Sequence, residues 1–232
     1  MGGSTRSYGH RSVTIPYSHM DWDDACMFYE ALNSLLTYAN RRLGVVDGDD
    51  IVIDGDDFGA KRDAVRVGEM LWRNRWVIEE FVKGDPGRLG KARLAMVDGW
   101  RHAVRATLTC MGANPDFALY MADDALFVVG AMESAADFFV RSLPSLVLVT
   151  MLPFKGGIVV DGKVMGLSDE PVPGAVESMT ESLRGLLREG RVVSTASELV
   201  AYCDTHDGGN LVPASTQAWL DLQLGLGLET GG

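Results

Sequence analysis

The chain is poor in cysteine and in long hydrophobic runs, and each shortage argues against a class of protein. Its three cysteines, Cys26, Cys110 and Cys203, lie far apart in 232 residues. This spacing is typical of reduced thiols and not of a disulfide framework or a zinc knuckle. No apolar run reaches the roughly 18 residues that a membrane-spanning helix needs. We therefore predict a cytoplasmic protein with no membrane partner.

Basic residues are also few. Lys and Arg number 21 against 32 Asp and Glu, which gives a formal net charge of −11. Binding to nucleic acid depends largely on Lys and Arg that neutralise phosphates. The charge therefore predicts that the protein has no nucleic-acid partner.

The apolar pattern divides the chain into three parts. Residues 1–19 have no periodicity and are predicted to form a flexible arm, with Met20 a candidate for the natural start. Residues 20–166 are predicted to form an α+β core domain, and residues 167–232 a C-terminal helical extension packed on that core. Hydrophobic residues make up 47% of the chain, which is enough for a core without metals or disulfides.

Helical periodicity comes first along the core domain, and extended periodicity follows it. Helices are predicted to about residue 42 and over 61–83, 88–104, 134–141, 175–189 and 195–203, with a last one from about 214. Strands are predicted over 106–111, 117–121, 125–130, 145–152 and 157–160. This order predicts an α+β fold with N-terminal helices, a central antiparallel sheet of about five short strands, and C-terminal helices.

The segment TMLPFKGGIVVDGKVMG, residues 150–166, has the strongest local pattern. Pro153 is predicted to end one strand, Lys155-Gly156-Gly157 to reverse the chain, and Asp161-Gly162 to form a turn after the next strand. A hairpin explains every residue of this corner except Phe154 and Lys155. These two residues either close the edge of the core or contact a partner.

The string LPFKGGIVVDG resembles the L-P-F-x-x-x-I-x-x-D-G signature of a family of uncharacterised bacterial proteins. The segments LWRNRWVIEEFVKGDPGRL, VDGW and FYEALNSLLTYAN are similar to that family as well, so the resemblance spans about residues 20–166. Asp85 stands where the family pattern has Asn before Pro. The resemblance implies a bacterial, cytosolic origin and a stable α+β unit, and it implies no activity.

Two tryptophans add a second candidate surface. Trp72 and Trp76 are four residues apart in the predicted helix 61–83, so they share a face that is offset from its aliphatic stripe. Such a face is either buried against another helix or exposed to a partner. We predict a non-enzymatic protein-binding or regulatory module, with Phe154, Lys155, Trp72 and Trp76 as candidate partner-binding residues.

An Asp-rich segment supports an alternative function. Asp54, Asp56 and Asp57 offer oxygen ligands to a divalent cation, although Phe58 and Val65 occupy ligand positions of the calcium-loop pattern. The alternative is a divalent-cation-dependent hydrolase or phosphotransfer enzyme that uses this loop. The pair Cys203 and His206 is predicted to pack and cap a helix end. No catalytic residue and no cofactor is predicted.

Overall fold

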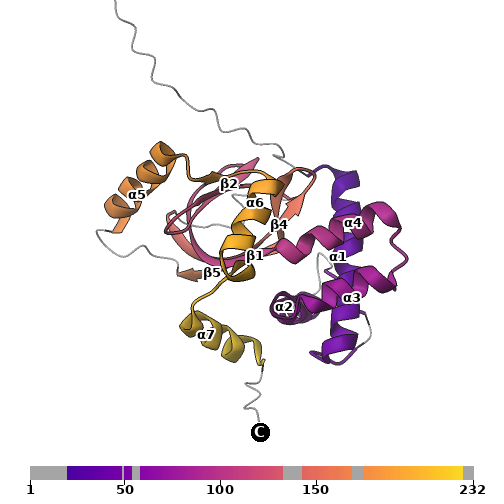
Figure 1. Ribbon diagram of the computed structural model, residues 1–232. Helices are drawn as coiled ribbons and strands as arrows, with labels where there is room; N and C mark the ends of the chain where they lie inside the picture. The colour runs from indigo at the N-terminus through magenta and orange to yellow at the C-terminus, as the bar shows by residue number, and fades with distance from the viewer. Residues whose placement is uncertain (1–19, 49, 54–57, 133–142, 169–174, 227–232) are drawn as a thin grey trace, which may run out of the picture.

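The structure is a computed structural model that describes residues 20–48, 50–53, 58–132, 143–168 and 175–226. Four N-terminal helices lie on one side of a curved sheet, and α5 lies on the other side (Figure 1). The helices are α1 (Trp22–Leu43), α2 (Phe58–Arg73), α3 (Trp76–Gly84), α4 (Lys91–Gly99), α5 (Ala175–Glu189), α6 (Ala196–Thr205) and α7 (Ala214–Leu224). The predicted arm 1–19 and helix 134–141 lie outside the described residues.

Five antiparallel strands form the body of the sheet, in the order β5-β4-β1-β2-β3. They are β1 (Val104–Ala113), β2 (Phe117–Met121), β3 (Leu126–Gly130), β4 (Ser145–Phe154) and β5 (Gly157–Ser168). The predicted α+β class is confirmed. The short strands β6 (Val192–Val193) and β7 (Asn210–Leu211) pair parallel with β3 and β1. They were not predicted, because two residues show no alternation.

The first helix follows directly from its sequence. The side chain of Asp21 accepts a hydrogen bond from the backbone N–H of Asp24, and Gly44 ends the helix with a φ of 63°. These are the usual start and stop of a helix, since a capping carboxylate satisfies a free N–H and glycine adopts positive φ readily. The apolar residues that repeat at helical spacing along α1 are all buried: Phe28, Leu32, Leu35, Leu36 and Ala39.

The predicted helix 61–83 is wrong in one respect, because the chain forms two helices that meet at Asn74 and Arg75. The Asn74 amide donates to the carbonyl of Met70, and the Arg75 guanidinium donates to the carbonyl of Trp72. These side chains satisfy carbonyls at the end of α2, so the helix can stop there. As a result Trp72 and Trp76 do not share a face.

The predicted helix 88–104 is also shorter than its apolar pattern suggested. Helix α4 ends at Gly99, a 3-10 turn η1 covers Trp100–His102, and β1 begins at Val104. The Arg101 side chain donates to the carbonyl and the carboxylate of Asp98. Trp100 and Val104 are fully buried, which shows that burial in the sheet, and not the helical period, decides the conformation at this boundary.

The hairpin between β4 and β5 confirms the predicted chain reversal. Lys155 and Gly156 both have positive φ, 44° and 83°, as a two-residue hairpin turn requires. Pro153 does not end the strand: it pairs with Ile158, and β4 continues to Phe154. Because β1 begins opposite Met151, this end of β4 pairs with β5 and tolerates a residue that lacks an amide hydrogen.

Phe154 closes the core at this corner. Its side chain is 2% exposed and meets the Phe28 ring edge to face at 5.6 Å. The adjacent Lys155 is exposed and forms an ion pair with Asp24 at the start of α1. The turn therefore places one side chain in the core and the other at the surface.

No described helix has both the length and the apolar composition needed to cross a membrane. This finding agrees with the absence of long apolar runs from the sequence.

We expect Phe154→Ala to lower the free energy of unfolding by about 3–5 kcal/mol, because it opens a cavity in a packed aromatic cluster. Lys155→Ala is the matched control and should cost less than about 1 kcal/mol, since half-exposed ion pairs contribute little. Urea unfolding followed by circular dichroism measures both values. Equal costs for the two variants would contradict the buried position of Phe154.

Candidate functional site

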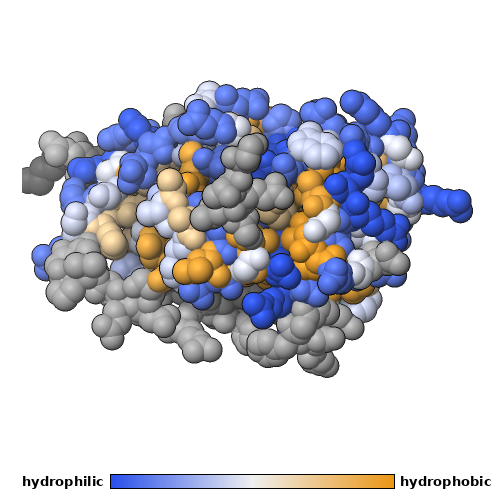
Figure 2. Space-filling view, turned by 90° about the horizontal axis from the view of Figure 1, so that it is seen from below, coloured by the Kyte–Doolittle hydropathy of each residue, from blue (hydrophilic) through white to orange (hydrophobic). Residues whose placement is uncertain are grey.

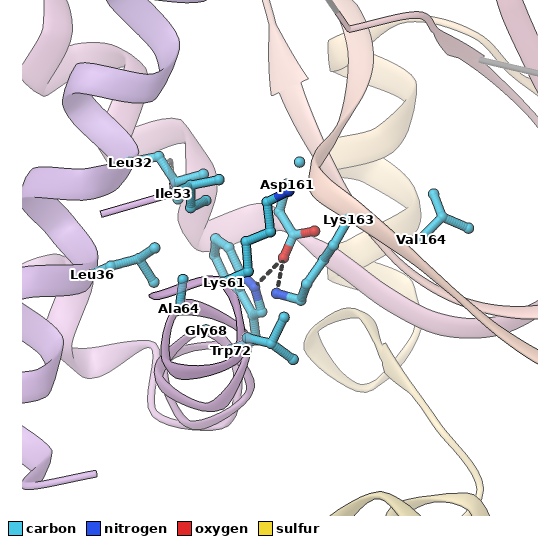
Figure 3. Close-up of a pocket in the computed structure, with 12 residues that line it drawn as sticks. Leu32, Leu36, Ile53, Lys61, Ala64, Gly68, Trp72, Asp161, Lys163 and Val164 are labelled. Carbon is cyan, nitrogen blue, oxygen red and sulfur yellow. Dashed lines mark hydrogen bonds and ion pairs between the residues drawn. The ribbon is translucent and has the colours of Figure 1, made fainter. Parts of the chain in front are cut away.

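A cavity of about 250 Å³ lies between α1, α2 and β5 (Figure 3). Most of its lining is apolar and comes from two helices, the segment 50–53 and β5: Leu32, Leu36, Ile53, Ala64, Val65 and Val164. Polar side chains enter it from α2 and β5, namely Lys61, Trp72, Asp161 and Lys163. The cavity therefore combines apolar walls with a small set of polar groups, as ligand pockets do.

A bulge in β5 places the acidic and basic groups of this site. Val149 of β4 pairs with Val164 and Met151 pairs with Val160, so Asp161, Gly162 and Lys163 stand opposite the single residue Thr150. Gly162 has a φ of 86°, which glycine adopts without strain. The prediction of a turn at Asp161-Gly162 is therefore wrong, because the same dipeptide also suits a β-bulge.

The sequence contained a signal for this site that the turn interpretation concealed. Residues two apart in a strand point to one face of the sheet. Asp161 and Lys163 have this spacing, so reading 157–164 as one strand would have predicted an acid and a base on the same side. Neither residue was among the predicted site residues.

The carboxylate of Asp161 is the centre of the polar cluster. Its Oδ2 accepts from Trp72 Nε1 at 2.7 Å and from Lys163 Nζ at 2.6 Å, as Figure 3 shows. The other oxygen, Oδ1, is buried and accepts no hydrogen bond from the described part of the chain. The Asp161 side chain is 1% exposed. The carboxylate is thus a buried anion that is held by one cation and one indole N–H.

Gly68 of α2 makes room for the lysine ammonium group. A Cβ atom at this position would lie 2.8 Å from Lys163 Nζ, which is closer than nonbonded atoms approach. The Lys163 side chain is 23% exposed. Glycine at position 68 therefore lets the ammonium group rest against the helix, beside Asp161.

A second buried ion pair fixes α2 on the sheet. Glu69 of α2 and Arg105 of β1 form a salt bridge, and both side chains are 0% exposed. Glu69 and Trp72 are three residues apart, so they project from the same side of the helix. Glu69 contacts β1 and Trp72 contacts β5. These two contacts fix the position of α2, which forms one wall of the cavity.

The structure separates the four predicted partner-binding residues. Trp72 and Phe154 are each 2% exposed, so neither side chain offers surface to a partner. Trp76 is 44% exposed, with the guanidinium of Arg42 at 5.7 Å from its ring, and Lys155 is exposed as well. Partner binding at Trp76 and Lys155 stays a prediction. Only Trp72 of the four lines the cavity.

The predicted metal ligands Asp54, Asp56 and Asp57 lie outside the described residues. Within the described ranges, one group of three potential ligands comes together: His102, Cys203 and Asp204. The position of Arg75 argues against a metal site, because its Nη1 lies 3.8 Å from Cys203 Sγ. A metal ion there would share the thiol with a guanidinium cation, so this group is a poor cation site.

Cys203 and His206 do not form a catalytic pair. Cys203 is buried, and burial raises the pKa of its thiol although Arg75 acts in the opposite direction. His206 stacks on Tyr202, and its Nε2 lies 2.9 Å from Asp124 Oδ2. The imidazole thus ties the end of α6 to the turn between β2 and β3.

Hydrophobic residues also reach the surface away from the cavity. Figure 2 shows hydrophobic residues among hydrophilic ones on the face seen from below. Of the described residues, exposed apolar side chains include Leu146, Trp219 and Leu222. Nothing in the structure shows what covers them, so they do not define a site.

We expect Trp72→Phe to lower the free energy of unfolding by about 1.5–3 kcal/mol, the usual contribution of a hydrogen bond to a charged group. Trp76→Phe is the control and should change it by less than about 0.5 kcal/mol, since its indole is exposed. Chemical denaturation compares them. If the Trp72 variant were as stable as the control, the bond from its indole to Asp161 would not hold the site together.

The cysteines give a test of thiol reactivity. Burial raises the pKa of Cys110 to about 11 and also raises that of Cys203, so both thiols stay protonated at pH 8 and react slowly. Cys26 is exposed. Iodoacetamide at pH 8 should therefore modify the folded protein at Cys26 alone and all three thiols in urea, as mass spectrometry of peptides would show. Rapid native modification of Cys203 would indicate a reactive thiol.

Comparisons of the chain with models of known protein families, with curated proteins and with solved structures give no match.

Proposed function

We propose that this protein binds a small, largely apolar ligand in the cavity between α1, α2 and β5. The observation that carries the proposal is the buried carboxylate of Asp161, which stands with Lys163 and Trp72 at an otherwise apolar cavity. Its bonds hold the polar groups in place, and the apolar walls offer contact area to a ligand. Binding in such a site needs no rearrangement of the sheet.

The energetics support a binding role over a purely structural one. Burying an ion pair costs desolvation free energy, and apolar side chains of similar volume often give equal or greater stability. The unpaired Oδ1 adds a further cost of about 1–3 kcal/mol. Apolar side chains that filled the cavity would pack better than these polar groups. Departures of this kind from good packing are expected at functional sites.

The size of the cavity limits the ligand. An apolar cavity of roughly 150 Å³ admits benzene, and pockets for drug-sized molecules begin at about 300 Å³. A volume of about 250 Å³ therefore suits one ring or one branched chain with a polar head. The ligand that we propose is accordingly a small molecule of about ten non-hydrogen atoms.

The small-molecule ligand proposed for the cavity differs from the protein partner that the sequence predicts. A protein partner at the exposed side chains of Trp76 and Lys155, and a cation-dependent enzyme that uses Asp54, Asp56 and Asp57, stay predictions. Neither Trp76 nor Lys155 is among the described residues that line the cavity.

The test is titration with 2-phenylethanol and 3-methylbutanol, followed by the indole N–H signals of the five tryptophans in a ¹⁵N–¹H spectrum. Trp72→Phe assigns the Trp72 signal. We expect a saturable shift of that signal at millimolar ligand, because Trp72 lines the cavity and donates to Asp161.

A cavity-filling variant provides the control. Ala64 is 4% exposed and lines the cavity, so Ala64→Leu should abolish the shift, while Ala92→Leu on the exposed face of α4 should leave it unchanged. Absence of a saturable Trp72 shift with every single-ring and branched-chain probe, charged probes included, would overturn the proposed function.

A further inference from the structure

We infer that the ligand carries a carboxylate and that the ammonium group of Lys163 binds it. This inference rests on the proposed function of the cavity and adds the chemical class of the ligand. The inference depends on the polar groups of the site that can still form a hydrogen bond with a ligand.

Lys163 has hydrogen-bonding capacity that the fold leaves unused. An ammonium group has three N–H donors, and Lys163 Nζ has one acceptor among the described residues, Asp161 Oδ2 at 2.6 Å. The side chain is 23% exposed, so water reaches the group only in part. An acceptor from a ligand would satisfy the remaining donors in a setting where apolar walls strengthen the interaction.

Asp161, in contrast to Lys163, has no accessible hydrogen-bonding group left for the ligand. Its Oδ2 already accepts two donors, and its Oδ1 is buried without accessible surface. The carboxylate therefore serves to position Lys163, together with Gly68, whose missing side chain leaves space for the ammonium group. A ligand head that offers only donors finds no accessible acceptor among these side chains.

The hydrogen-bonding groups at the cavity favour an anion over a cation. Lys163 presents donors to the cavity, whereas the oxygens of Asp161 already accept hydrogen bonds or are buried. A carboxylate also offers two oxygens with several lone pairs, which matches an amine with more than one free donor.

The ligand class is therefore a small carboxylic acid with a single apolar ring or branched chain. The apolar body contacts the side chains from α1 and α2, and the carboxylate lies at Lys163. The volume of about 250 Å³ excludes fatty acids with long chains, because most of such a chain would project into solvent.

Three probes with one phenyl body and different heads test the inference: phenylacetate, 2-phenylethanol and phenylethylammonium. Dissociation constants are measured at pH 7 from the Trp72 indole N–H shift. We expect phenylacetate to bind at least about tenfold more tightly than the alcohol, a factor that corresponds to one charge-assisted hydrogen bond. The ammonium compound should bind most weakly.

Two variants assign the effect to Lys163. Lys163→Met should remove the advantage of phenylacetate over the alcohol, and Lys83→Met, at an exposed lysine of α3, should keep it. Gly68→Ala should also reduce the advantage, because its Cβ displaces the ammonium group, while leaving the lysine and its charge in place. Gly185→Ala on α5, where a Cβ meets open space, is its control.

The outcomes separate the two proposals. If the alcohol or the ammonium compound bound as tightly as phenylacetate, the carboxylate inference would be overturned and ligand binding would stand. If Lys163→Met failed to fold, unchanged selectivity in Gly68→Ala would still refute the role of Lys163. If none of the three probes shifted Trp72, the inference would fall together with the proposed function.

Discussion

The position of α2 on the sheet depends on charges that are buried between them. Glu69 meets Arg105 of β1, and Trp72 meets Asp161 of β5. An apolar contact tolerates sliding, whereas a buried charge must keep a partner at hydrogen-bond distance because losing it costs several kcal/mol. These two links therefore fix both the register and the rotation of α2. The cavity exists because the helix is held there and cannot move closer to β5.

This arrangement uses stability that the aromatic core supplies. Phe28 packs against both Trp100 and Phe154, with ring centroids 5.2 and 5.6 Å apart, and so joins α1, η1 and the β4–β5 hairpin. Burial of large aromatic side chains is among the strongest contributions to folding. Where α2 packs on the sheet, by contrast, Asp161 Oδ1 and Glu69 Oε1 have no hydrogen bond from the described residues. The aromatic cluster thus supplies stability, while Asp161 at the cavity keeps a buried oxygen without a donor among the described residues.

The hairpin corner and the bulge show which backbone features the local sequence predicts and which it does not. Lys155-Gly156 was correctly identified as a reversal, since positive φ at two successive residues is a local requirement. Asp161-Gly162 is also a turn dipeptide by sequence, but only Gly162 has positive φ, and β4 continues to pair beside it, so it forms a bulge. A local pattern cannot distinguish the two, because the difference lies in whether a neighbouring strand continues to pair. The acid and base of the site were missed for this reason.

The sequence by itself determined the α+β class, the five antiparallel strands, the caps of α1 and the chain reversal at Lys155-Gly156. The caps and the chain reversal depend on residues close together in the chain, and the class follows from the local periods of the helices and strands. The tertiary structure decided which tryptophan is buried, where the helix 61–83 breaks and which polar groups meet at the cavity. Trp72 and Asp161 are 89 residues apart. Their contact requires α2 to lie on β5, and only the packing of the whole chain sets that placement.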